Sequence, residues 1–149
     1  MDVQFQPSLG YLAQTGTLRG IGVFASRALE AGEVVEVSPV IQLKLEFDEM
    51  DVDLKRRVFN WERLASVQGV SAIALGYGSM YNHANPANMR YSCAFAGEAI
   101  AFIAVRAIHR GEELTINYNG VGGAPASDED DWFKICDVVP LRSDNLNNA

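Results

Sequence analysis

Short runs of apolar and β-branched residues, separated by glycine, dominate the pattern along the chain. "GIGVFASRAL" (residues 20–29) and "AGEVVEVSPVIQLKL" (residues 31–45) have the composition of strands, and we expect them to pair antiparallel across a turn at Gly32. The same strand character returns in three later runs, at residues 71–78, 98–108 and 111–120. The pattern therefore predicts a mainly β domain.

One segment, residues 51–64, has the spacing of a helix instead. Its apolar residues recur every three or four positions, at Leu54, Val58, Trp61 and Leu64. Acidic residues come early in the segment and basic residues follow, as the helix dipole favours. We expect one inserted helix over these residues.

Length and composition limit the chain to a modest range of architectures. With 149 residues, 48% of them hydrophobic, it is expected to form one domain with a real core. No apolar run approaches the ~20 residues that span a bilayer, and no signal-peptide pattern is present. The predicted location is intracellular, cytoplasmic or, in a eukaryote, nuclear, with no membrane partner. Cys93 and Cys136 lack metal-ligand spacing, so no metal site is predicted.

The net charge narrows the choice of partner. The formal charge is −7, and residues 127–131 form the acidic run "SDEDD". Nucleic-acid binders normally carry a basic surface, so no nucleic acid is expected as a partner. A basic, Lys-rich peptide suits this charge better, although ordinary solubility would also explain it.

Three separated motifs concentrate the chemical groups of the chain. The first, residues 19–26, contains Gly20, Ile21 and Gly22; such paired glycines let a ligand approach the backbone, or else they form a tight turn. The second is "YNHANPAN" (residues 81–88), whose amides and imidazole offer many hydrogen-bonding groups, unless they serve only in turns.

The third motif is "IHRGEELTINYNG", residues 108–120. A turn leads into a strand that ends at Tyr118, which by itself is typical of a half-buried strand aromatic. Together and in this order, the three motifs resemble the signature of the SET-domain protein lysine methyltransferases, over residues 19–120. "LGYGSMYNH" (residues 75–83) also resembles small standalone members of that family.

The resemblance implies a fold and an activity. The fold would be a mainly β, β-clip-like SET domain of several short sheets, with a pseudoknot near the C-terminal motif. A single domain would cover residues 1–149, with a core at about residues 9–120, an aromatic segment at about 127–141 and a loose tail at 142–149. The activity would be methyl transfer from S-adenosyl-L-methionine to the ε-amine of a lysine in a protein substrate, histone-like or other.

The resemblance also implies roles for individual residues. Tyr118 and Tyr91 would be catalytic, Tyr118 by aligning the amine and Tyr91 by limiting the number of methyl groups. Cofactor binding would involve Gly20, Ile21, Gly22, Asn82, His83 and Tyr118. The substrate channel would be lined by Tyr81, Tyr91, Trp132 and Phe133, the last two of which equally suit plain core packing. Asn88 would brace the loop structurally.

The chain departs from the family pattern inside the second motif. The family usually has "NHSCxPN", whereas Ala84, Asn85 and Ala87 interrupt that pattern here. These changes keep open an alternative: a non-catalytic module of the same fold that binds a Lys-containing peptide or the cofactor. A small-molecule methyltransferase is disfavoured because the Gly-rich βαβ signature is missing. Homodimerisation to complete the substrate groove is left open.

Overall fold

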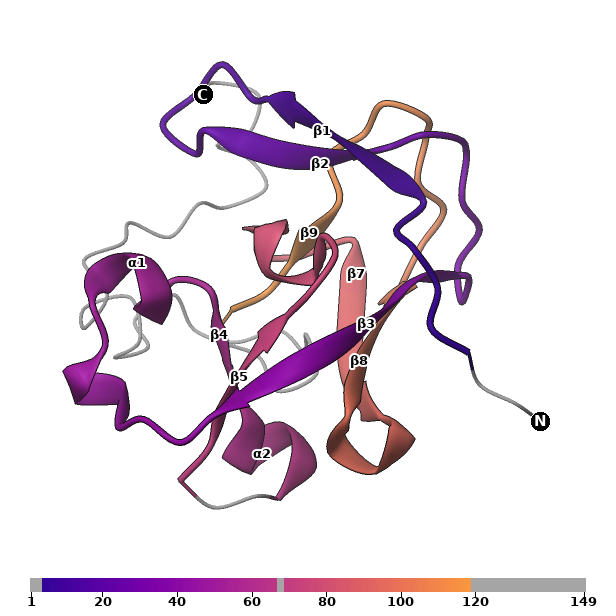
Figure 1. Ribbon diagram of the computed structural model, residues 1–149. Helices are drawn as coiled ribbons and strands as arrows, with labels where there is room; N and C mark the ends of the chain where they lie inside the picture. The colour runs from indigo at the N-terminus through magenta and orange to yellow at the C-terminus, as the bar shows by residue number, and fades with distance from the viewer. Residues whose placement is uncertain (1–3, 67–68, 119–149) are drawn as a thin grey trace.

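The computed structural model describes residues 4–66 and 69–118, and in that part of the chain the strands form three sheets. β1 (Gly10–Gln14) and β2 (Ile21–Ala25) form an antiparallel hairpin. A five-stranded sheet has the order β4-β5-β3-β8-β7, with bounds Val58–Asn60, Ser71–Ala74, Val34–Leu43, Ala99–Ala104 and Met89–Ala94. The third sheet pairs β6 (Asn82–His83) with β9 (Thr115–Ile116). Figure 1 shows the hairpin above the five-stranded sheet, and the mainly β architecture is confirmed.

The expected pairing of residues 20–29 with residues 31–45 is wrong. β2 pairs with β1, a strand that the pattern did not indicate, whereas β3 pairs with β5 and β8. The reason lies in β3, where residues 35–38 are all buried, because a strand covered in this way belongs inside a sheet. Gly32 does lie in a turn, with φ of +86°.

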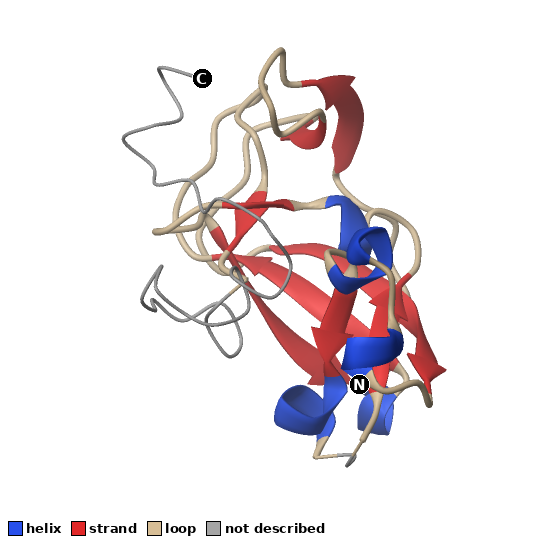
Figure 2. Ribbon diagram, turned by 90° about the vertical axis from the view of Figure 1, so that its left-hand side faces the viewer, coloured by secondary structure: helices blue, strands red, loops and turns tan. Residues whose placement is uncertain are grey.

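The single helix expected over residues 51–64 is also wrong. α1 (Val52–Lys55) is capped by the Asp51 side chain, which accepts a hydrogen bond from the Leu54 amide at 2.8 Å, but it lasts only four residues. Strand β4 follows and pairs with β5, before α2 (Trp61–Ala65) begins. Figure 2 shows only short helical turns beside the strands.

Tertiary contacts explain the interruption of this helix. Phe59 lies in β4 with its ring edge-on to Tyr91 and Phe102, at centroid distances of 5.4 and 6.1 Å. Pairing with β5 and burial of this ring outweigh the weak local preference for helix. None of the helices in residues 4–66 and 69–118 is long and apolar enough to cross a membrane.

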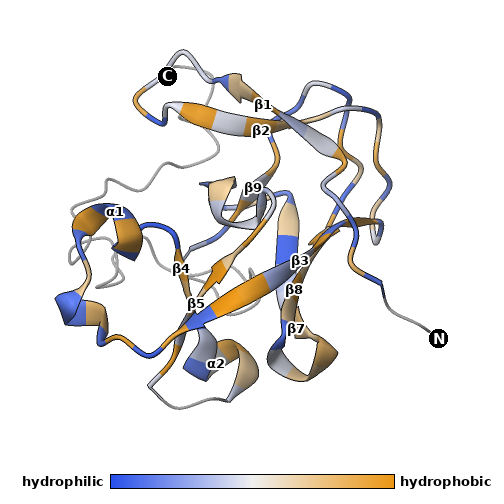
Figure 3. Cartoon of the chain, in the orientation of Figure 1, coloured by the Kyte–Doolittle hydropathy of each residue, from blue (hydrophilic) through white to orange (hydrophobic). Residues whose placement is uncertain are grey.

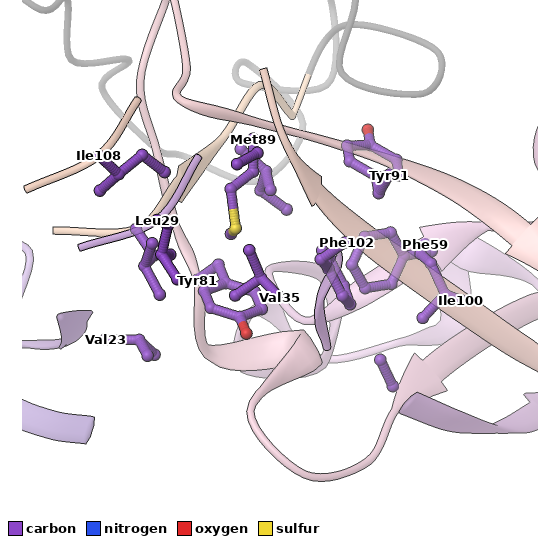
Figure 4. Packing of buried hydrophobic residues seen from close by; sticks show 14 of the residues in the cluster. Val23, Leu29, Val35, Phe59, Tyr81, Met89, Tyr91, Ile100, Phe102 and Ile108 are labelled. Atoms are coloured by element: carbon purple, nitrogen blue, oxygen red, sulfur yellow. The ribbon is translucent and has the colours of Figure 1, made fainter. Parts of the chain in front are cut away.

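The hydrophobic core lies between the five-stranded sheet and the segments that cross it. Phe102 of β8 is fully buried and contacts three other rings, Tyr81 at 4.8 Å, Phe59 and Tyr91. Figure 4 shows this cluster, and Figure 3 shows hydrophobic positions along β3. The aromatic centre of the core therefore directly supports two tyrosines that the sequence assigned to the site.

Replacing Phe102 by alanine should test this support. We expect the free energy of unfolding to fall by about 3–5 kcal/mol, because the change removes buried apolar area and leaves a cavity. Urea unfolding would measure the loss. Leu18→Ala is the control, since Leu18 is fully exposed and its loss should change stability by less than about 0.5 kcal/mol. Equal effects of the two substitutions would contradict the assignment of Phe102 to the core.

Candidate functional site

Two short parallel strands bring the second and third motifs together. Asn82 pairs with Thr115 and His83 with Ile116, and the Ala84 amide donates to the Ile116 carbonyl at 3.0 Å. Ala84, which departs from the family pattern, is therefore held by its backbone and does not interrupt this pairing. The peptide bond that follows Asn85 is cis.

Asn88 joins the same two motifs through its side chain. Its Nδ2 donates to the Glu113 carbonyl at 2.8 Å, and its Oδ1 accepts from the Thr115 amide at 2.9 Å. The side chain is buried, so both bonds are shielded from water. Asn88 thus links the loop after β6 to the segment that enters β9.

The glycine motif lies at the end of the β1–β2 hairpin and contacts the second motif. Gly20 has φ of +72°, and its N–H donates to the Thr17 carbonyl at 3.1 Å within the hairpin turn. The Ile21 carbonyl accepts from Nδ2 of Asn82 at 3.1 Å. A Cβ added at Gly22 would lie 2.7 Å from Oε2 of Glu113, so a larger residue there would force this carboxylate to shift.

An arginine and a glutamate, which the sequence did not single out, complete this junction. Arg19 forms an ion pair with Glu113, and the exposed fractions of the two side chains are 11% and 9%. Burial lowers the pKa of Arg19, and the nearby Tyr118 acts in the opposite direction. Nε and Nη1 of Arg19 are buried and have no hydrogen-bond partner among the described residues. Such donors are costly to leave unpaired, so they suit a ligand with an anionic group.

Tyr118 is held by both of its polar groups. Its N–H donates to Nδ1 of His83 at 3.0 Å, and its hydroxyl donates to the Tyr81 carbonyl at 2.6 Å. The rings of Tyr118 and His83 lie 5.3 Å apart. Burial raises the pKa of Tyr118 to about 12, although the positive charges of Arg57 and Arg19 oppose the shift. At neutral pH this hydroxyl is therefore uncharged and can donate or accept a hydrogen bond.

Tyr91 approaches the same place from the core. Its ring is buried in β7, and its hydroxyl donates to the Asn117 carbonyl at 3.1 Å. Asn117 directly precedes Tyr118, so the two tyrosines are linked through one peptide unit. In Figure 4 the hydroxyl of Tyr91 points away from the ring of Tyr81.

Tyr81 is held in the core by its ring and its hydroxyl, and its expected place in the substrate channel stays a prediction. Its ring is 1% exposed, and its hydroxyl donates to Oε1 of Glu36 at 2.6 Å. Glu36 also accepts from the Tyr77 amide at 3.0 Å. Burial raises the pKa of Glu36, and these hydrogen bonds oppose the shift. The ring anchors Tyr81 in the core, and the backbone carbonyl is the group that meets Tyr118.

The structure thus brings together most of the residues that the sequence nominated. Residues of all three motifs meet around Asn82, His83 and Tyr118, with Tyr91 behind them. Trp132 and Phe133 lie outside the described residues. The contributions of Arg19, Glu36 and Glu113 were missed. For Glu36 a signal was available, because it is a charged residue inside the apolar stretch "VVEV" at residues 34–37.

The geometry allows a limited chemistry. A neutral hydroxyl and a backbone carbonyl meet at one point, next to buried aromatic rings, so an amine placed there would be oriented and partly desolvated. Among residues 4–66 and 69–118, no group of three or more metal-ligating side chains lies close enough to hold an ion.

Comparisons with known proteins identify the family of the chain. The family model for the SET domain matches residues 20–119. A curated protein of Schizosaccharomyces pombe, named histone-lysine N-methyltransferase, H3 lysine-37 specific, is 32% identical over 100 residues, which cover 67% of each chain.

Solved structures share the fold. A Plasmodium falciparum protein provisionally named a histone methyltransferase aligns with a TM-score of 0.59 and 21% identity, over 76% of this chain and 94% of that one. A polycomb repressive complex 2 in its basal state aligns with a TM-score of 0.60 and 22% identity, over 78% of this chain but 17% of the longer one. The resemblance stated from the sequence is confirmed: the chain belongs to the SET domain family of protein-lysine N-methyltransferases.

Proposed function

We propose that the chain transfers a methyl group from S-adenosyl-L-methionine to the ε-amine of a lysine in a basic, histone-like protein. The observation that carries the proposal is the position of Tyr118, whose hydroxyl meets the Tyr81 carbonyl while its backbone amide is bound to His83. The histone-lysine specificity of the Schizosaccharomyces pombe relative supports the substrate class. A histone-like substrate would place the protein in the nucleus, if the source is a eukaryote.

The residues around Asn82 suit the polar end of the cofactor. Arg19 offers buried donors for a carboxylate, Gly20 and Gly22 keep side chains away from the backbone, and Asn82 and His83 line the junction. When bound, S-adenosyl-L-methionine supplies a methyl group on a positively charged sulfur, so that an N–C bond forms as the C–S bond breaks and the sulfur keeps the electron pair.

The protein must also bind the lysine amine of the substrate in its neutral form. A free lysine has a pKa near 10.4, so deprotonation at pH 7 costs roughly 4–5 kcal/mol. A desolvated position beside the rings of Tyr118 and Tyr91 disfavours the ammonium form. The Tyr118 hydroxyl, uncharged because its pKa is about 12, then aligns the amine by a hydrogen bond.

The net charge of −7 suits the proposed substrate, because an acidic protein attracts basic segments. The direct test is transfer of a radiolabelled methyl group to core histones and to other basic proteins. Incorporation that mass spectrometry locates on lysine supports the proposal. Binding of S-adenosylhomocysteine without any transfer would favour the non-catalytic module instead.

Tyr118→Phe should distinguish alignment of the lysine amine from binding of the cofactor. We expect kcat to fall by on the order of a hundredfold or more, because the hydroxyl that orients the amine is lost, while affinity for S-adenosylhomocysteine changes little. Steady-state kinetics and calorimetry would measure the two effects. Tyr11→Phe, which removes the hydroxyl of a half-exposed tyrosine on β1, is the matched control and should behave as wild type. Full activity of Tyr118→Phe would contradict the assigned role.

Tyr91→Phe should change the product and leave the rate similar. If the Tyr91 hydroxyl restricts the space beside the amine, its loss makes room for a further methyl group. Mass spectrometry of a methylated peptide should then show a shift toward higher methylation. An unchanged distribution of products, or a collapse of the total rate, would show that this hydroxyl only supports the Asn117 carbonyl.

The raised pKa of Tyr118 predicts a pH dependence of stability. Above about pH 10 tyrosine ionises in the unfolded chain, whereas folded Tyr118 keeps its proton until about pH 12. The stabilising contribution of this group is therefore complete below pH 10 and is lost as pH rises toward 12. Urea unfolding at several alkaline pH values should show a shallower decline for Tyr118→Phe than for wild type. Parallel declines would contradict burial of this hydroxyl.

A further inference from the structure

Glu113 is the carboxylate at which the three motifs converge. One oxygen, Oε1, pairs with Arg19, the first residue of the glycine motif. The other oxygen, Oε2, accepts from Nδ2 of Asn82 at 2.8 Å and packs closely against Gly22. Both oxygens of one side chain are therefore engaged by residues from the other two motifs.

The backbone on either side holds this carboxylate in place. The Glu113 carbonyl accepts from Asn88, and Glu113 forms an antiparallel bridge with Phe24 of β2. The next amide, that of Leu114, donates to the Val23 carbonyl at 2.7 Å. Because the main chain is bound on both sides, the direction of the Glu113 side chain is fixed before any ligand arrives.

A fixed carboxylate determines how Asn82 presents its amide. A carboxylate only accepts hydrogen bonds, so the NH₂ group of Asn82 must face Glu113. That group also donates to the Ile21 carbonyl, so both of its hydrogens are used. The amide oxygen of Asn82 then faces elsewhere, and no described residue donates to it among the hydrogen bonds of this side chain.

The same carboxylate also determines how Arg19 presents its guanidinium. Pairing with Glu113 uses Nη2, so Nε and Nη1 are the donors left for a ligand. One acceptor on Asn82 and two donors on Arg19 match a ligand end that carries both an ammonium and a carboxylate group. The amino-acid end of the proposed cofactor has this chemistry.

We propose that Glu113 is a positioning residue that orients the Asn82 amide and the Arg19 guanidinium for binding of the amino-acid end of the cofactor. This inference rests on the proposed function. In the proposed reaction Glu113 contacts no reacting atom, and it affects activity through cofactor binding. A merely structural role, in which the ion pair only ties the hairpin to the sheet, makes a different prediction.

Glu113→Gln tests the inference, because it preserves size while removing the charge that pairs with Arg19. The Kd for S-adenosylhomocysteine and the KM for the cofactor should rise about tenfold or more, with kcat changed less than about threefold. Calorimetry far below the melting temperature would measure Kd. Glu112→Gln is the matched control: this neighbouring acid pairs with Arg106 at the surface at 2.7 Å, and its loss should leave both values unchanged.

A double-mutant cycle with Asn82→Ala isolates the link between the two side chains. If Glu113 acts partly through Asn82, the two substitutions together should raise Kd by less than the product of their separate effects. Strictly multiplicative effects would overturn this coupling. If Glu113→Gln does not fold, we expect the same rise in Kd and KM for Glu113→Asp. The shorter side chain of aspartate keeps the charge but moves it away from Asn82.

The possible outcomes distinguish a failure of this inference from a failure of the proposed function. If wild type neither binds S-adenosylhomocysteine nor transfers methyl groups, the proposed function is wrong. If wild type does both, while Glu113→Gln lowers only the melting temperature and leaves Kd and KM unchanged, Glu113 is structural and the inference alone is overturned. A fall in kcat at unchanged KM would overturn it as well.

Discussion

The parallel pairing of two-residue strands β6 and β9 is the interaction on which the candidate site depends. It places Asn82 beside Thr115 and His83 beside Ile116, and so brings Tyr118 within reach of His83. So short a pair supplies few hydrogen bonds of its own and is not stable alone. Asn88 adds side-chain bonds across it, and the buried core around Phe102 supports it from beneath. The site is therefore a product of the whole fold.

Hydrogen bonds between buried polar groups fix the positions of the residues in this site. Glu36 holds the ring of Tyr81, the Tyr81 carbonyl receives the Tyr118 hydroxyl, and the Asn117 carbonyl receives that of Tyr91. Each hydrogen bond satisfies a polar group that would be costly to bury without a partner. If one residue of this network moves, the group bonded to it loses its partner and incurs that cost. Burial also keeps Tyr118 neutral at physiological pH, because it raises the pKa of this hydroxyl to about 12.

Charge is divided between the site and the rest of the molecule in a way that suits a cationic substrate. The chain as a whole has a net charge of −7, which attracts basic segments over distance. At the junction of the three motifs, the pairing of Arg19 with Glu113 places opposite charges side by side. Tyr118 packs against the buried hydrophobic cluster, and the positive charges of Arg57 and Arg19 act on it from nearby. Such surroundings disfavour a charged ammonium group.

The sequence by itself determined the strand character, the three motifs and the family, because these depend on residue types and spacings within short stretches. It predicted one helix over residues 51–64, yet pairing of Phe59 with a strand neighbour interrupts it. Only the tertiary structure decided the partners of β2 and β3, and that the carbonyl of Tyr81 meets Tyr118. Glu113 and Asn82 lie 31 positions apart, and local patterns carry no information about contacts at that separation.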